Sequence, residues 1–289
     1  MFAGTGTALI TPFAKDGSVD EEALRRLVNF QEENGVNTLV PCGSTGESAT
    51  MSYEEHLKVV SIVVDEAKKA KVLAGAGSNC TSEAVELSKK AEDLGADGIL
   101  SISPYYVKPT QEGIYLHFKA ISEAVDCPIV VYNIPGRTGS NIAVETTLKL
   151  AELPGIAAIK EASGNVNQIQ KILAYRPKGF EVLSGDDGLT LGLMSMGADG
   201  VVSVASNCCP GLVSEMVNNA MNDNFDIAKG IHNKLFPLFG ALFCESNPIP
   251  IKYVMGTMGY GNGCPRLPLT PLSEKGRAIL DPVLKELGI

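Results

Sequence analysis

The sequence contains no cluster of lysines and arginines, no long apolar run and no Cys-x-x-C spacing. Its formal net charge of -9 argues against binding of nucleic acid or of an anionic membrane as the main role. No apolar segment approaches the roughly 18 residues that a membrane-spanning helix needs. Residues 1–12 lack a basic segment followed by an apolar one, so we expect no signal peptide and a cytoplasmic protein.

The cysteines and histidines also follow no recognisable spacing pattern. The seven cysteines are odd in number and follow no disulfide framework, which is typical of reduced thiols in a cytosolic protein. The three histidines are scattered along the chain, so their spacing indicates no metal site. We therefore look for chemistry in other residue types.

Short apolar segments alternate with longer amphipathic segments along most of the chain. The apolar segments show little strict alternation, which is typical of strands buried on both faces of a parallel sheet. We expect strands at Thr5–Ile10, Thr38–Cys42, Val72–Gly75, Gly98–Ser101, Ile129–Asn133, Ile156–Lys160, Glu181–Ser184 and Gly200–Val204. We expect helices at Glu21–Asn34, Tyr53–Ala70, Ser82–Leu94, Gln111–Val125, Ala143–Ala151, Val166–Tyr175, Leu189–Met196 and Leu212–Asn222. Eight strands, each followed by a helix, predict an α/β fold of the (β/α)8 TIM barrel type.

The alternation stops after residue 222. Three helices with no strands between them are expected at Phe225–Ala241, Ile249–Met258 and Ser273–Leu287. We therefore predict a catalytic barrel over residues 1–222 and a C-terminal helical appendage over residues 223–289. The pattern leaves open whether the appendage packs on the barrel or on a second subunit.

Two residues at predicted strand ends can carry chemistry, because functional groups of a TIM barrel lie at the carboxyl ends of its strands. Lys160 ends an apolar strand, and a buried lysine has a lowered pKa that suits a neutral amine nucleophile. Alternatively, it extends out of the barrel mouth toward Glu161. Tyr132 ends the preceding strand, where a phenol can act as acid and base beside a carbonyl or simply pack at the rim.

The loops at the same end add polar groups. Residues 43–47, Gly-Ser-Thr-Gly-Glu, offer hydroxyls and backbone N–H groups that can cradle a small carboxylate or cap the next helix. Arg137 can grip a carboxylate with two hydrogen bonds or remain a solvated surface group. Of the adjacent Tyr105 and Tyr106, one can face a site and the other an interface, or both can simply pack. The carboxylates of residues 186–187 are more typical of a helix cap than of catalysis.

Taken together, these segments resemble one family, the pyruvate-dependent class I aldolases that include dihydrodipicolinate synthase and N-acetylneuraminate lyase. The resemblance is carried by G-S-T-G-E at 43–47, Y-Y at 105–106, Y-N-I-P-G-R-T-G at 132–139, I-K-E-A-S-G at 159–164 and S-G-D-D at 184–187. Their order and spacing match from Met1 to about Pro250, and the joint pattern is highly specific. The chain is more similar to the synthase branch than to the others.

The resemblance implies catalytic roles for four residues. Lys160 would form an imine with pyruvate and would itself serve as the electron sink, so no metal or organic cofactor is implied. Tyr132 would move protons during imine and enamine formation. Ser44 would link Tyr132 to Tyr106, which in this family comes from a neighbouring subunit. The chain is therefore expected to form a homo-oligomer, most simply a tetramer built as a dimer of dimers.

The resemblance also implies how the substrates are held. Thr45 and its backbone would bind the pyruvate carboxylate, and Arg137 would bind the carboxylate of L-aspartate-4-semialdehyde. Gly185 and Val202 would line the pocket. The expected product is 4-hydroxy-tetrahydrodipicolinate, on the route to diaminopimelate and lysine.

One departure from the synthase pattern leaves an alternative open. Synthases usually carry threonine where Ser44 stands, whereas serine is typical of the sialic-acid lyases. Serine keeps the hydroxyl but loses the stiff β-branched rotamer. Arg137 favours the synthase, because lyases of the other branch tend to have an apolar residue there. A sibling lyase, or a non-catalytic protein that binds pyruvate or lysine, is the alternative.

A second site follows from the same resemblance. Lysine-inhibited members of the family bind L-lysine at a subunit interface. In this chain Glu83 would bind the amine of the lysine, and Asn79 and Tyr105 would bind its carboxylate. The positions that match this site are Ser48, Ala49, His56, Asn79, Glu83 and Tyr105. Some lysine-sensitive relatives carry a second histidine where Tyr53 stands. The alternative is that His56 and Glu83 are ordinary helix residues.

Overall fold

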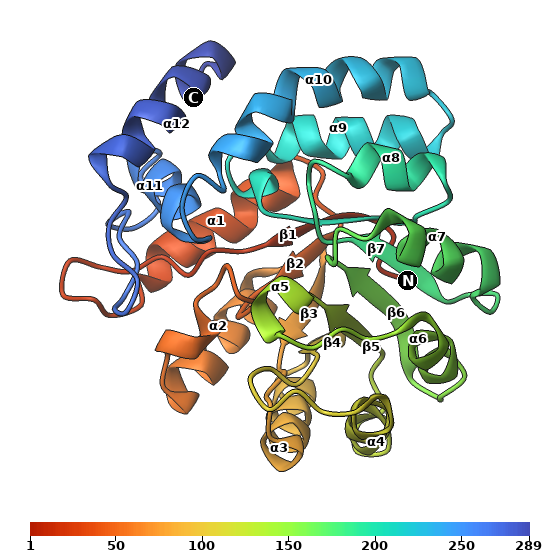
Figure 1. Ribbon diagram of the computed structural model, residues 1–289. Helices are drawn as coiled ribbons and strands as arrows, with labels where there is room; N and C mark the ends of the chain where they lie inside the picture. Colours follow the sequence, from red (N-terminus) through yellow and green to blue (C-terminus); the bar gives the residue numbers. More distant parts are fainter.

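A computed structural model describes residues 1–289. Eight parallel strands follow one another around a closed barrel, in which β8 pairs with β1 (Figure 1). The strands are β1 Gly4–Ala8, β2 Thr38–Val40, β3 Lys71–Gly75, β4 Gly98–Ile102, β5 Ile129–Asn133, β6 Ile156–Glu161, β7 Glu181–Ser184 and β8 Gly200–Ser203. The predicted (β/α)8 TIM barrel is therefore confirmed.

Helices form a ring outside the barrel and pack their apolar faces on the strands (Figure 1). The ring consists of α1 Glu21–Glu33, α2 Tyr53–Glu66, α3 Thr81–Asp93, α4 Gln111–Ser122, α6 Val144–Ala151, α7 Val166–Tyr175, α8 Thr190–Ser195 and α9 Pro210–Met221. Shorter pieces stand in the loops: η1 Ser48–Thr50, α5 Pro135–Thr138 and η2 Ala205–Asn207.

The barrel interior is a packed core rather than a pore. Ten buried residues fill it, among them Phe2, Leu73, Tyr132 and Val202. Phe2 occupies the end of the barrel where the strands begin, and a Cβ at Gly98 would lie 2.6 Å from its ring. Glycine is required there because the aromatic ring fills the space a side chain would need. The opposite end, where Tyr132 lies, is thus the end at which a substrate can approach.

The predicted bounds agree with the observed ones at most elements, and the differences have local causes. The second helix was expected to reach Ala70 but ends at Glu66. Glu32 Oε1 accepts the backbone N–H groups of residues 68–70, each at 2.8 Å, which holds this segment outside the helix. The short helix α5 was not predicted, because Pro135-Gly136 is typical of a turn. Arg137 consequently lies on a helical turn instead of a loop.

Three further helices follow the barrel: α10 Phe225–Ala241, α11 Ile249–Thr257 and α12 Glu274–Leu287. They lie on one side of the ring, with α10 beside α9 (Figure 1). Their buried residues, including Leu235, Ile251 and Leu280, belong to the same apolar core as the outer face of the barrel. The appendage therefore packs on the barrel of its own chain. None of the helices combines the length and hydrophobicity that a membrane-spanning segment needs.

Candidate active site

Strands β5 and β6 place the two predicted catalytic residues side by side. Tyr132 and Lys160 are direct register partners across this parallel pair. Lys160 Nζ lies 4.2 Å from the centroid of the Tyr132 ring. Each side chain is only 6% exposed, so both are largely withdrawn from solvent. The amine and the phenol thus form one buried cluster on the inside of the barrel.

The environment of Lys160 favours a reactive amine. Burial lowers its pKa from 10.5 to about 8, and the positive charge of Arg137 acts in the same direction. Gly185, which follows β7, leaves room for the side chain, since a Cβ there would lie 3.0 Å from Lys160 Cε. A lysine with this pKa has a substantial neutral fraction near pH 8, which nucleophilic attack on a carbonyl requires.

Asp187 is a charged neighbour of Lys160 whose position sequence reasoning missed. Its charge opposes the lowering of the lysine pKa. The carboxylate is buried and accepts the backbone N–H groups of Val204 and Ala205, each at 3.0 Å. The sequence pattern alone favours a helix-cap role for this carboxylate. Only the barrel closure, which brings the ends of β6, β7 and β8 together, identifies Asp187 as part of the site.

Tyr132 is a weak acid in its resting state. Burial raises its pKa to about 12, while the positive charge of Arg137 and the Ser44 hydroxyl act in the opposite direction. A protonated phenol can donate to a developing oxyanion and recover the proton later. The sequence placed Ser44 in a loop after β2, and the structure brings its hydroxyl to Tyr132.

Thr45 and Arg137 are joined through one residue of the C-terminal region. The Thr45 hydroxyl accepts a hydrogen bond from Asn247 Nδ2 at 3.0 Å. Arg137 Nη2 donates to the backbone oxygen of the same Asn247 at 2.9 Å. Asn247 gave no signal in the sequence, because it lies far beyond the strand ends that guided the search. The structure therefore includes the segment just before α11 in the site.

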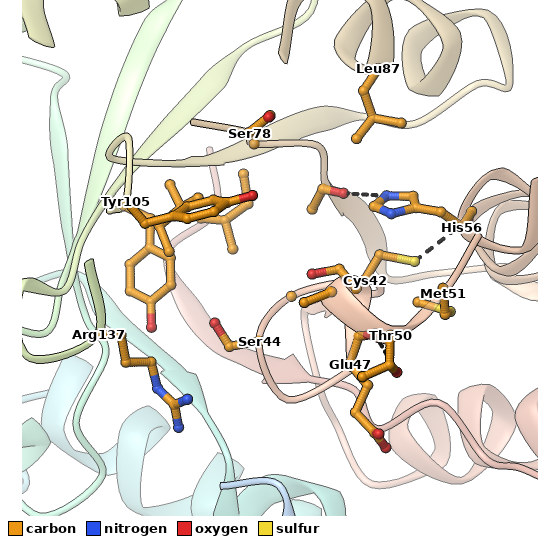
Figure 2. Close-up of a pocket in the computed structure, with 18 of the residues that line it drawn as sticks. Cys42, Ser44, Glu47, Thr50, Met51, His56, Ser78, Leu87, Tyr105 and Arg137 are labelled. Carbon is orange, nitrogen blue, oxygen red and sulfur yellow. Dashed lines mark hydrogen bonds between the residues drawn. The ribbon is translucent and has the colours of Figure 1, made fainter. Parts of the chain in front are cut away.

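A cleft of about 940 Å³ opens at this end of the barrel. Figure 2 shows Arg137, Ser44 and Tyr105 on one side, and His56, Leu87 and Met51 on the other. Ser44, Tyr132, Arg137 and Asn247 line it. The residues that line the cleft do not include Lys160, Thr45, Gly185 or Val202, and Val202 is buried on β8 inside the barrel.

Tyr106 is the predicted catalytic residue that the single chain does not bring to its own site. Its side chain is 86% exposed and its backbone is left-handed, with a φ of 71°. It does not line the cleft, although Tyr105 does. This exposure leaves the Tyr106 hydroxyl free to contact a second chain.

Most of the expected lysine-binding positions border the same cleft. Five of the six line it: Ser48, Ala49, His56, Glu83 and Tyr105. Asn79 lies beside it and donates to the backbone oxygen of Tyr105 at 3.2 Å. His56 is not a surface residue, because its side chain is buried with Nε2 2.7 Å from the Gly75 carbonyl. Glu83 accepts a hydrogen bond from Ser78 at 2.8 Å.

A comparison with known protein families shows the family to which the chain belongs. The model of the dihydrodipicolinate synthetase family matches residues 1–287. The chain belongs to this family. The prediction made from the five motifs is confirmed.

Relatives in the family match this chain along nearly its whole length. A 4-hydroxy-tetrahydrodipicolinate synthase of Chloroherpeton thalassium is 53% identical over 99% of this chain and 96% of its own. A dihydrodipicolinate synthase from Acinetobacter baumannii, solved in complex with pyruvate, has a TM-score of 0.98 and 45% identity, with both chains fully covered. The enzyme from Cyanidioschyzon merolae, solved with lysine bound, has a TM-score of 0.97 and 42% identity over 99% of this chain and 98% of its own.

Proposed function

We propose that this protein condenses pyruvate with L-aspartate-4-semialdehyde to form 4-hydroxy-tetrahydrodipicolinate, through a Schiff base on Lys160. The observation that carries the proposal is the buried Lys160 amine beside the Tyr132 phenol, a residue that lines the cleft at the carboxyl ends of the strands. The full-length synthase relatives agree with this activity rather than with that of a sibling lyase. The enzyme is a class I aldolase-type lyase.

The first half of the reaction forms the imine. The neutral Lys160 amine attacks the keto carbon of pyruvate, while Thr45 and its loop hold the carboxylate. Tyr132 gives a proton to the carbonyl oxygen, and one proton of the attacking amine returns to the phenol through the Ser44 hydroxyl. A second proton from Tyr132 lets the oxygen leave as water, which gives a protonated imine and a Tyr132 phenolate.

The second half forms the carbon–carbon bond. The Tyr132 phenolate takes a methyl proton from the protonated imine to give an enamine, whose electron pair attacks the aldehyde carbon of the semialdehyde. Tyr132 then protonates the aldehyde oxygen, which becomes the product hydroxyl, while Arg137 holds the carboxylate of this second substrate. The amine of that substrate attacks the imine carbon and closes the ring; one of its protons leaves with Lys160 as the free amine, and the other returns to the Tyr132 phenolate.

The test is the initial rate of condensation, followed through a coupled dihydrodipicolinate reductase, with sialic-acid cleavage measured in parallel. Condensation without cleavage is the expected result. Arg137→Met should raise KM for the semialdehyde by about 10- to 100-fold, because a charge-assisted pair to a carboxylate is lost. The variant should still form a borohydride-trapped adduct with pyruvate. Cleavage without condensation would assign the protein to the sialic-acid lyase branch.

The proposal extends to the assembly. Tyr106 of one chain completes the relay of Tyr132 and Ser44 in another, within a homotetramer formed as a dimer of dimers in the cytoplasm. Sedimentation velocity at assay concentration measures the assembly. Mixing inactive Tyr106→Phe with inactive Lys160→Met subunits should restore part of the activity if the site is shared. A fully active monomer would contradict the sharing.

L-Lysine is proposed as an inhibitor at the positions around Glu83. Support comes from the cleft shared by these positions and the substrate residues, and from the lysine-bound relative. Inhibition at millimolar L-lysine is expected, with loss of inhibition in Glu83→Gln because the carboxylate that pairs with the ligand amine is gone. Unchanged activity at that concentration would exclude the site.

A further inference from the structure

A second buried lysine lies close to the candidate active site. Lys252 on α11 is 1% exposed, and its ammonium donates to Glu47 Oε1 at 2.6 Å and to the Thr11 carbonyl at 3.0 Å. The Phe13 ring covers it, with the centroid 3.6 Å from Nζ. The Glu47 side chain in this pair is fully buried. Two opposite charges are thus held together without solvent, a costly arrangement unless it supports something specific.

Glu47 is also the last residue of the Gly43–Glu47 loop that carries Ser44 and Thr45. Its backbone is left-handed, with a φ of 57°, and Cys42 before the loop has a φ of 56°. Residues with side chains adopt this conformation only where their surroundings hold them in it. The loop is therefore bounded on both sides by strained residues and needs external contacts to keep its shape.

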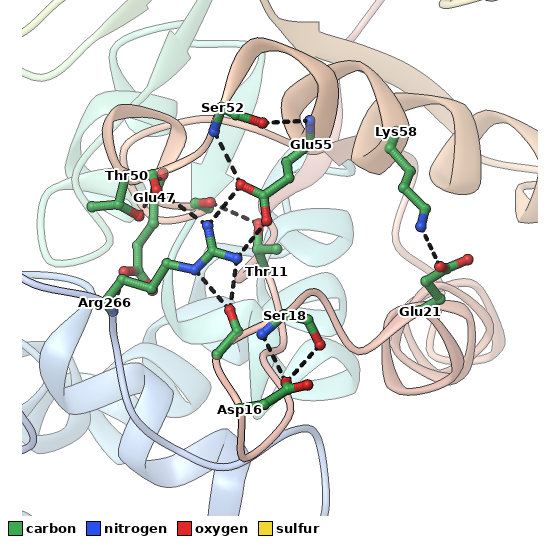
Figure 3. Close-up of polar contacts among 12 residues, drawn as sticks. Thr11, Asp16, Ser18, Glu21, Glu47, Thr50, Ser52, Glu55, Lys58 and Arg266 are labelled. Carbon is green, nitrogen blue, oxygen red and sulfur yellow. Dashed lines mark hydrogen bonds and ion pairs between the residues drawn. The ribbon is translucent and has the colours of Figure 1, made fainter.

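Residues that contact the Lys252–Glu47 pair also make the contacts that hold the loop. Thr11, whose carbonyl binds Lys252, donates its hydroxyl to the Gly46 carbonyl at 2.7 Å. Glu47 Oε2 accepts the backbone N–H of Arg266 at 2.9 Å. The Arg266 guanidinium in turn binds Glu55 and the Thr50 carbonyl, as Figure 3 shows. The Gly43–Glu47 loop is thus fixed at Gly46 and Glu47, and the chain just after it is fixed at Thr50.

The same stretch of chain contacts the other substrate-facing residues. Asn247, five positions before Lys252, binds both Thr45 and Arg137. A shift of α11 would consequently move the hydroxyl, the guanidinium and the strained loop together. Lys160 on β6 lies outside this set of contacts.

We propose that Lys252 and Glu47 are positioning residues, whose buried ion pair fixes the Gly43–Glu47 loop so that Ser44 and Thr45 meet the substrate. This inference rests on the proposed function, because it concerns the pyruvate-binding step of that reaction. The pair acts on the binding of pyruvate and on the relay, and it makes no hydrogen bond with the Lys160 amine.

The test compares variants of the full-length protein in three measurements: thermal midpoint, kcat and KM for pyruvate, and adduct trapped by borohydride below the parental KM. Lys252→Met and Glu47→Gln each remove one partner of the pair. Thr11→Val removes only the hydroxyl that binds Gly46 and serves as the mild variant if the others fail to fold. Arg176→Met is the matched control, because it breaks the ion pair with Asp199 at the end of the barrel where the strands begin.

Lys252→Met and Glu47→Gln are expected to raise KM for pyruvate about tenfold or more, since misplacing a binding group by about 1 Å costs up to 10²-fold. Thr11→Val should raise it by a smaller factor. All three should still trap adduct at saturating pyruvate, and Arg176→Met should lower the thermal midpoint while KM stays at the parental value.

A lowered midpoint with parental KM in Lys252→Met, Glu47→Gln and Thr11→Val would overturn the inference, because the pair would then act on stability alone. If only Thr11→Val folds, a parental KM in that variant overturns it as well. A parent protein that traps no pyruvate would instead overturn the proposed function, so the two failures are distinguishable.

Discussion

The two buried lysines, Lys160 on β6 and Lys252 on α11, have different surroundings. Burial lowers the pKa of each from 10.5 to about 8. Lys252 has a carboxylate at 2.6 Å and a carbonyl at 3.0 Å. Lys160 has no hydrogen bond that opposes the effect of burial; only the charge of Asp187 does so. A similar pKa therefore arises in a paired ammonium and in an unpaired one.

The comparison shows that a lowered pKa does not by itself identify a nucleophile. The Lys252 ammonium has two acceptors, is covered by Phe13 and is buried, so a carbonyl substrate has no line of approach. Lys160 has no such acceptors and lies next to a proton donor, Tyr132, that lines the cleft. Contact with a cleft-lining proton donor and the lack of a competing partner distinguish the reactive amine from the structural one.

The largest expected effect separates the two lysines by chemistry. Lys160→Met should lower kcat roughly 10⁴-fold or more, because the covalent route is lost. It should abolish the adduct that borohydride traps with pyruvate. Mass spectrometry of the trapped parent should place the adduct on the peptide that contains Lys160. An adduct on Lys252, or one that survives in Lys160→Met, would reverse the assignment.

The second prediction compares how much each of the two lysines contributes to the free energy of unfolding. Lys252→Met should lower the free energy of unfolding by about 3–5 kcal/mol, because it leaves the Glu47 carboxylate buried without its cation. Lys160→Met should leave stability equal or higher, since it removes a buried amine without close partners. Urea midpoints with matched m values measure both. Equal losses in the two variants would show that Lys160 is held by contacts of its own.

The third prediction concerns pH. Because the pKa of Lys160 lies near 8, its amine is protonated and unreactive at lower pH and neutral at higher pH. The value of kcat/KM for pyruvate should therefore fall toward tenfold per pH unit below about pH 8. Lys252→Met should keep the midpoint of this profile while lowering its height. A flat profile between pH 6 and 9 would show that deprotonation of Lys160 does not control imine formation.

The sequence predicted the barrel well because its strands and helices have strong local signals. Lys160 and Tyr132 could also be found in this way, as each ends a strand and strand ends meet at one face of a barrel. Asn247, Asp187 and Lys252 could not be assigned roles, since each acts through contacts that exist only after the chain closes. The pairing of Lys252 with Glu47 joins residues 205 positions apart, and no periodic pattern encodes such a pair.

The smallest expected effect concerns Ser44, which the loop holds against Tyr132. Ser44→Thr keeps the hydroxyl and restricts its rotamers, so kcat should rise by no more than about threefold. Ser44→Ala, the control, removes the hydroxyl and should lower kcat by about 10²-fold as proton transfer to Tyr132 is interrupted. Parental activity in Ser44→Ala would remove Ser44 from the relay. A tenfold loss in Ser44→Thr would instead show that the loop, as Lys252 and Glu47 hold it, leaves no room for the extra methyl group.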